Sequence, residues 1–73
     1  MVKQPENKIS MMLLKKRFEK NLSQRKMAEE IGVSYPVYSG IERNTYKASL
    51  KLLSKIADYL KLDLKTVINL YLK

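Results

Sequence analysis

The chain has 73 residues and 45% hydrophobic content, which suits one small globular domain and leaves little room for a second. Fifteen Lys and Arg residues against seven Asp and Glu residues give a net charge of +8, which favours a polyanionic partner, either nucleic acid or an anionic membrane surface. The chain contains no cysteine and no histidine, so it lacks the commonest general base and metal ligands, and we expect no enzyme, no metal site and no cofactor.

Residues 1–8 are polar and show no hydrophobic periodicity, and we expect them to form a flexible arm. From Ile9 to Lys20, apolar residues recur at spacings of three and four, which predicts an amphipathic helix. Ser10 is its candidate N-cap, and Asn21 is a candidate left-handed residue at its end. The predicted buried face consists of Ile9, Met12, Leu13, Leu14 and Phe18.

The stretch from Ser23 to Arg43 contains two short helical patterns separated by a glycine. Ser23 is a suitable N-cap for a helix over residues 24–31, and Gly32 supplies a tight turn. Ala28, in the middle of the first pattern, is small where the two helices would touch. This is the layout of a helix-turn-helix, whose second helix fits the major groove of DNA.

The second helix of this unit is predicted to end near Arg43, with Asn44 in a left-handed conformation after it. Its start depends on Pro36, which is favourable in the first turn but disfavours helical angles in the residue before it. Tyr35, rather than Ser34, is therefore the predicted cap.

Two further helices are predicted after this unit. Ser49 is the candidate N-cap of a helix over residues 50–62, and Asp63 is the candidate N-cap of a last helix over residues 64–73. The predicted inward stripe of the first of these consists of Leu50, Leu53, Ile56, Ala57 and Leu60. No strand-type alternation persists, so we predict an all-α fold of five helices, with residues 9–73 forming a single domain.

The last helix is apolar nearly all round, and only part of it is needed to cover the core. Leu64 and Val67 or Ile68 can pack on the core, which leaves three apolar residues without an obvious intramolecular partner. An exposed apolar patch usually marks an interface, so we expect a homodimer through this helix; the alternative is that the three residues complete the core. The predicted dimer interface consists of Leu70, Tyr71 and Leu72.

Arg17 and the segments LSQRKMAEEIGVS (22–34), SGIERN (39–44) and SLKLLSKIADYL (49–60) resemble the Cro/repressor, or XRE-type, family of helix-turn-helix proteins. The resemblance implies a five-helix, lambda-repressor-like domain in which the second and third helices form the helix-turn-helix. It also implies binding to double-stranded DNA at a two-fold site, as a dimer, and an ion pair between Arg17 and Glu42.

The resemblance places base reading on the third helix, where relatives usually present Gln, Arg or Lys. Gly40 has no side chain with which to read a base. Because this helix carries no arginine or glutamine at these positions, we expect a modest preference per base pair or a dependence on DNA shape. The candidate base contacts are Tyr35, Pro36, Val37 and Ser39.

The candidate phosphate contacts lie at the start of the second helix, around the third helix and in the loop that follows it. They are Ser23, Gln24, Arg25, Lys26, Ser34, Tyr38, Arg43, Asn44, Thr45, Tyr46 and Lys47. Four lysines on the last two helices are interpreted as solubility charges instead: Lys51, Lys55, Lys61 and Lys65.

We therefore predict a sequence-specific, DNA-binding transcription regulator, a repressor that occupies a two-fold operator as a homodimer. One alternative is a controller protein of a restriction–modification system, which YSGIERN (38–44) followed by SLKLL (49–53) also resembles. Another is an antitoxin-like module that binds a protein partner through the last helix. With no apolar run of about 18 residues and no signal-peptide pattern, we expect a cytoplasmic, nucleoid-associated protein and no membrane partner.

Overall fold

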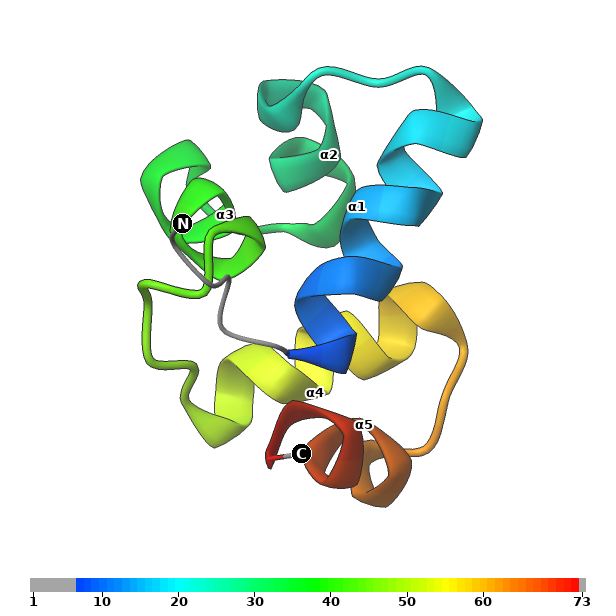
Figure 1. Cartoon of the computed structure of the whole chain (residues 1–73), viewed down its shortest axis with the longest axis vertical. Helices are drawn as coiled ribbons and strands as arrows, with labels where there is room; N and C mark the ends of the chain where they lie inside the picture. The colour runs from blue at the N-terminus through cyan, green and yellow to red at the C-terminus, as the bar shows by residue number, and fades with distance from the viewer. Residues whose placement is uncertain (1–6, 73) are drawn as a thin grey trace, which may run out of the picture.

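The computed structural model describes residues 7–72, and over this range all of the regular structure is helical. The helices are α1 (Lys8–Lys20), α2 (Gln24–Ile31), α3 (Tyr35–Glu42), α4 (Leu50–Leu60) and α5 (Leu64–Leu72). The helix-turn-helix pair α2 and α3 lies at one end of the molecule and α5 at the other, and α1 runs between them (Figure 1). The predicted all-α fold of five helices is confirmed.

The first helix begins one residue earlier than predicted, and its N-cap is Asn7 rather than Ser10. The Oδ1 atom of Asn7 accepts hydrogen bonds from the backbone N–H groups of Ile9 (2.9 Å) and Ser10 (3.2 Å). Its Nδ2 atom donates to Oδ1 of Asn44 (3.2 Å) and to the carbonyl of Tyr71 (3.4 Å). Asn7 is therefore buried and joins α1 to the α3–α4 loop and to α5.

Two residues of the predicted arm, Asn7 and Lys8, thus belong to α1 and its cap, whereas residues 1–6 lie outside the described residues. Ser10 lies inside the helix, where its hydroxyl donates to the carbonyl of Ile41 and links α1 to α3. The serine that was predicted to cap α1 therefore has a tertiary role instead of a capping role.

The other helix ends follow local chemistry closely. Ser23 and Ser49 cap α2 and α4, since each hydroxyl oxygen accepts a backbone N–H of the first helical turn at 3.1 Å. Asn21 and Gly32 adopt left-handed conformations with φ of 58° and 93°. The helix α4 ends at Leu60, two residues earlier than predicted, and Lys61 follows it in the same left-handed conformation.

The start of α3 differs from the prediction, because Tyr35 is already helical and Ser34 is the residue that precedes the helix. The backbone N–H of Tyr38 donates to the carbonyl of Ser34 at 3.0 Å and closes the first turn. Pro36, the second helical residue, has no N–H to leave unpaired. The predicted cap at Tyr35 is wrong, since the restriction before proline is a preference that tertiary packing overrides.

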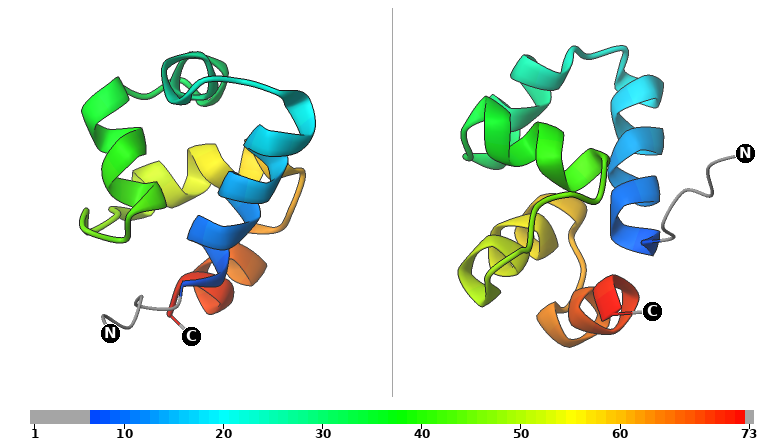
Figure 2. Two further views of the ribbon diagram at one scale, coloured as in Figure 1. Left: turned by 45° about the horizontal axis from the view of Figure 1, so that its top comes forward. Right: turned by 60° about the vertical axis from the view of Figure 1, so that its left-hand side comes forward.

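All five helices contribute buried residues to one core, and Figure 2 shows the five helices arranged around it in two further views. Two residues predicted to face inward, Phe18 and Leu50, are 65% and 61% exposed. At 3.6 residues per turn, Phe18 lies about 140° around α1 from the buried Leu13, and Leu50 lies about 90° from the middle of the buried face of α4. The buried apolar residues are Ile9, Leu13, Met27, Ala28, Ile31, Tyr38, Ile41, Leu52, Leu53, Ile56, Ala57 and Val67.

The end of α5 is more closely tied to the domain than predicted. The hydroxyl of Tyr71 accepts a hydrogen bond from the backbone N–H of Ala48 at 2.9 Å, and Leu70 and Tyr71 pack against the core. Leu72 is 75% exposed. The expectation that these three residues lack intramolecular partners is therefore wrong for Leu70 and Tyr71.

The α3–α4 loop packs closely against α3 at Gly40. Its carbonyl accepts hydrogen bonds from the backbone N–H groups of Thr45 (2.8 Å) and Tyr46 (3.2 Å). A Cβ atom added at Gly40 would lie 2.7 Å from the Cβ atom of Tyr46, a distance that real Cβ atoms do not show. Gly40, which has no side chain with which to read a base, therefore makes room for Tyr46 to pack against α3.

Gly40→Ala is expected to lower the free energy of unfolding by about 1 kcal/mol, because overpacking costs roughly 1–3 kcal/mol and the gain in helix propensity is only about 1 kcal/mol. In a Tyr46→Gly background the opposing atom is gone, and the same substitution should stabilise the protein. Urea unfolding of the four proteins of this cycle measures both effects. A loss of equal size in the two backgrounds would contradict the proposed clash.

Candidate DNA-binding surface

The turn between α2 and α3 is held by backbone hydrogen bonds. The N–H groups of Gly32 and Val33 both donate to the carbonyl of Ala28, at 2.9 and 3.0 Å. The left-handed conformation of Gly32 ends α2, and α3 begins three residues later. Ala28, which is 2% exposed, allows the two helices to approach closely. Residues predicted from spacing to form a helix-turn-helix therefore do so.

Glu42, the last residue of α3, is the centre of a buried polar cluster. Its carboxylate accepts hydrogen bonds from Nε (2.6 Å) and Nη2 (3.2 Å) of Arg17 and from Nε2 of Gln24 (2.8 Å). The hydroxyl of Tyr38 also donates to it. The Arg17 and Glu42 side chains are 14% and 5% exposed. The cluster therefore joins α1, α2 and α3 through one carboxylate.

This cluster controls the protonation of its members. Burial raises the pKa of the Glu42 carboxyl, but the hydrogen bonds from Arg17, Tyr38 and Gln24 outweigh it and hold the pKa below its usual value. Burial, and then the carboxylate of Glu42, raise the pKa of the Tyr38 phenol well above its usual value. Glu42 is thus a carboxylate and Tyr38 a neutral donor at neutral pH.

The cluster also limits what two predicted phosphate contacts can do. Tyr38 is completely buried and its single hydroxyl proton goes to Glu42, so the prediction of a phosphate contact for Tyr38 is wrong. Gln24 is half-buried and gives one amide N–H to Glu42, which leaves the other for a phosphate. Ser23 is exposed, and its hydroxyl proton remains available although its oxygen caps α2.

The exposed side chains of α3 are confined to its N-terminal half. Ser34, Tyr35 and Pro36 are exposed and Val37 is half-buried. Ser39 is only 6% exposed, because the C-terminal half of α3 is covered by α1 and by the loop at Tyr46. The prediction of a base contact for Ser39 is therefore wrong.

The loop after α3 presents most of its polar side chains to solvent. Arg43, Thr45, Tyr46 and Lys47 are exposed, and Tyr46 is 43% exposed while its Cβ atom faces Gly40. Asn44 is half-buried, adopts a φ of 58° and accepts the hydrogen bond from Asn7. The Asn44 side chain therefore orders the loop and is not fully available to a phosphate.

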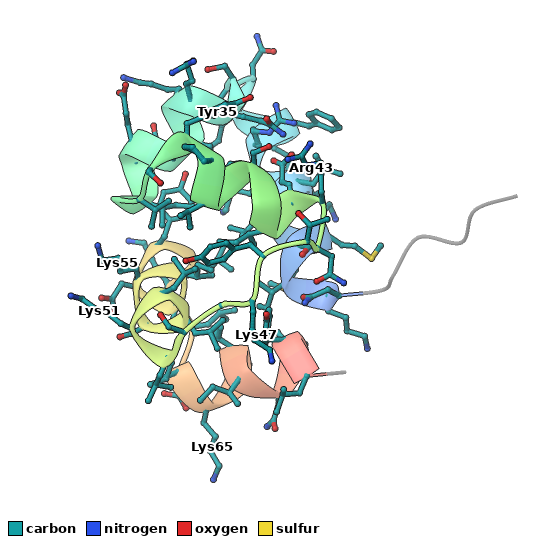
Figure 3. All side chains as sticks on the ribbon, turned by 90° about the vertical axis from the view of Figure 1, so that its left-hand side faces the viewer. Tyr35, Arg43, Lys47, Lys51, Lys55 and Lys65 are labelled. Carbon is teal, nitrogen blue, oxygen red and sulfur yellow. The ribbon has the colours of Figure 1, made fainter. Side chains whose placement is uncertain are left out.

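Two lysines interpreted as solubility charges lie beside the helix-turn-helix. Lys51 and Lys55 line a cleft of about 300 Å³ together with Gly32, Ser34 and Val37. Nζ of Lys55 donates to the carbonyl of Gly32 at 2.9 Å. Figure 3 shows both lysines projecting sideways from α4, next to α3, whereas Lys65 projects from α5 at the end of the molecule away from α3. Sequence spacing did not reveal this, because the lysines are adjacent to α3 only after α4 folds back.

The described residues show neither a metal site nor a membrane segment. Within residues 7–72, no group of three or more acidic residues is placed to hold a metal ion. Over the same range, no helix has the length and apolar character needed to cross a membrane.

Comparison with known proteins identifies the same elements. Residues 13–67 match the family model described as helix-turn-helix, a range that includes every buried apolar core residue except Ile9. The chain is 40% identical over 60 residues to the "ImmF control region 10 kDa protein" of Bacillus phage phi105. This similarity covers 82% of the chain and 67% of the phage protein. No solved structure matches the chain at a significant level.

Proposed function

This chain belongs to the Cro/repressor, or XRE-type, family of helix-turn-helix proteins and is a DNA-binding transcription regulator, and on this premise we propose that it is a repressor. It binds a two-fold operator as a homodimer, without catalysis, and represses by occupying that operator. The DNA-binding domain includes all of the described residues, 7–72, and so begins two residues before the predicted boundary. A regulator of this kind acts where the genome is, so the proposal includes a cytoplasmic, nucleoid-associated location.

The observation that carries the proposal is the exposed N-terminal half of α3 with basic side chains on both sides of it. Tyr35 and Pro36 are exposed and Val37 is half-buried at the start of α3, and the N-terminal residues of a reading helix are those that contact base edges. The exposed cations that flank them are Arg25, Lys26, Arg43, Lys47, Lys51 and Lys55, of which the last four are assigned to phosphates. The name of the phage relative ties that protein to a control region, which supports a regulatory role here.

Selection of bound duplexes from a randomised pool tests sequence-specific binding to a two-fold site. We expect an inverted repeat whose half-site centres are about 34 Å, or one helical turn, apart. Lys47→Ala should weaken the selected duplex and unrelated duplexes by the same factor, because Lys47 is assigned to a phosphate. Recovery of no common motif, or a change of motif in the Lys47 variant, would contradict these assignments.

The homodimer is proposed to form through the end of α5, where Leu72 is 75% exposed. Leu72→Asp should weaken the dimer by about 3 kcal/mol or more, because each of two copies loses about 1.5 kcal/mol of apolar burial. Sedimentation equilibrium measures the effect. Met11→Asp is the matched control, since Met11 is 62% exposed on α1 and outside the proposed interface.

An equal effect of the two substitutions would remove α5 as the interface. A monomeric wild-type chain whose duplex binding is unchanged by Leu72→Asp would instead favour the second candidate function, a module that binds another protein through α5. The restriction–modification controller assignment shares the surface, dimer and inverted repeat described above, so these tests address the common mechanism of both regulators.

A further inference from the structure

Arg25 and Tyr35 form a stacked pair that joins α2 to the reading helix. The Cζ atom of Arg25 lies 4.6 Å from the centroid of the Tyr35 ring, within the range of a cation–π contact. Arg25 is the second residue of α2 and Tyr35 the first of α3, and both side chains are exposed. A guanidinium that stacks on an aromatic ring keeps its N–H groups available in its own plane.

The hydrogen-bonding capacity of this guanidinium is unused inside the domain. Among residues 7–72, Arg25 has neither a hydrogen-bond acceptor nor an ion-pair partner. The contrast is Arg17, whose guanidinium also stacks on an aromatic ring, that of Phe18 at 4.9 Å, but donates to Glu42 and to the carbonyl of Leu22. The Arg17 stack is thus part of the scaffold, whereas the Arg25 stack holds a set of unused donors.

The position of the pair places these donors at the part of the protein that meets base edges. The N-terminal residues of a reading helix contact the bases, and Tyr35 is the first residue of α3. Of the next two residues of α3, Pro36 is exposed and Val37 is half-buried, and neither side chain carries a hydrogen-bond donor. A paired arginine fork is the side-chain group that best matches the O6 and N7 acceptors of guanine.

We propose that Arg25, positioned by stacking on Tyr35, reads a guanine in the major groove, one in each half-site of the operator. Arg25 is then a specificity-determining residue supplied by α2 to a reading helix that lacks its own arginine and glutamine. Tyr35 acts on this contact by orienting the guanidinium. This inference rests on the proposed function and deepens it, because it identifies the base that the surface selects.

The test compares base preferences of Arg25→Lys, Tyr35→Ala and Tyr35→Phe with those of the wild type, using selection from randomised duplexes and titration of single-base variants. Arg25→Lys keeps the charge but loses the planar fork, so discrimination for guanine at one position of each half-site should fall by about 5- to 150-fold. Tyr35→Ala should relax the same position, and the double variant should lose little more than either single variant. Tyr35→Phe keeps the ring and should keep the preference.

Arg43→Lys is the matched control, because Arg43 is also exposed but lies at the opposite end of α3 and is assigned to a phosphate. It should leave every base preference unchanged. The inference is overturned if the wild type selects no guanine in either half-site, or if Arg25→Lys leaves all preferences intact. In that case a slope of log affinity against log salt that is smaller in magnitude by about 1 per copy in Arg25→Ala identifies a phosphate contact.

Failure of this inference is distinguishable from failure of the proposed function. Duplex binding that is strong, salt-dependent and selective but indifferent to Arg25→Lys overturns only the guanine contact. The absence of salt-dependent duplex binding in the wild type overturns both. Thermal unfolding midpoints equal to that of the wild type would show that the variants are folded, as expected for two exposed residues.

Discussion

Glu42→Ala is expected to lower the free energy of unfolding by about 3–5 kcal/mol, the cost of removing one partner from a buried ion pair. Arg17 would be left with a guanidinium that is only 14% exposed and has no carboxylate beside it. Gln24 and Tyr38 would lose their acceptor in the same step. For a domain of 73 residues this is a large fraction of the total stability.

Urea unfolding followed by circular dichroism measures this loss, and two variants serve as controls. Glu42→Gln keeps the size and one acceptor oxygen but removes the charge, so its loss should be intermediate. Glu30→Ala removes a carboxylate that pairs with Lys20 at 2.8 Å at the surface, where water replaces the partner, and should have little effect. A loss in Glu42→Ala no greater than in Glu30→Ala would contradict a structural role for the cluster.

The Glu42 carboxylate also makes the free energy of unfolding depend on pH. Because the pKa of Glu42 is lower in the folded protein than in the unfolded chain, its contribution is fully present above the unfolded pKa of about 4.3. The contribution is lost as the pH falls below that value through the folded pKa. Glu42→Gln should therefore show a smaller decrease of stability than the wild type between about pH 5 and pH 2.

Duplex affinity is expected to fall by about 10⁴-fold between about 50 and 200 mM salt. The exposed cations of the surface, Arg43, Lys47, Lys51 and Lys55, give four phosphate contacts per protomer and about eight per dimer, hence a log–log slope of about −7. Fluorescence anisotropy with a labelled duplex, measured over a series of salt concentrations, gives this slope. A slope near zero would exclude the proposed DNA surface.

Single charge removals locate the contacts on the surface. Lys47→Ala should reduce the magnitude of the slope by about 2, because a dimer carries two copies of the residue. Lys65→Ala should leave it unchanged, since Lys65 projects from α5 away from α3 (Figure 3). Lys51→Ala and Lys55→Ala should also reduce the magnitude of the slope if these lysines contact phosphates. Both variants should leave it unchanged if the lysines are solubility charges, as the sequence-based interpretation held.

The sequence alone determined the elements that depend on neighbouring residues. Apolar spacing located the helices, and the caps at Ser23 and Ser49 and the left-handed residues Asn21 and Gly32 lie where they were predicted. These features arise within one or two turns of chain, because a cap bonds to N–H groups only two or three residues away. The helix-turn-helix is itself a local unit and was therefore readable.

The tertiary structure decided which side chains of those elements are exposed on the proposed DNA-binding surface. Ser39 is buried. Tyr46 lies against Gly40 and Arg25 stacks on Tyr35, and in each of these two pairs the residues come from different elements. Asn7 was assigned to an arm for the same reason, since its partners Asn44 and Tyr71 are far away in the chain. Spacing along one helix gives the direction of a side chain but not what packs over it. The scaffold is thus a local property of the sequence, whereas the reading surface exists only where separate segments meet.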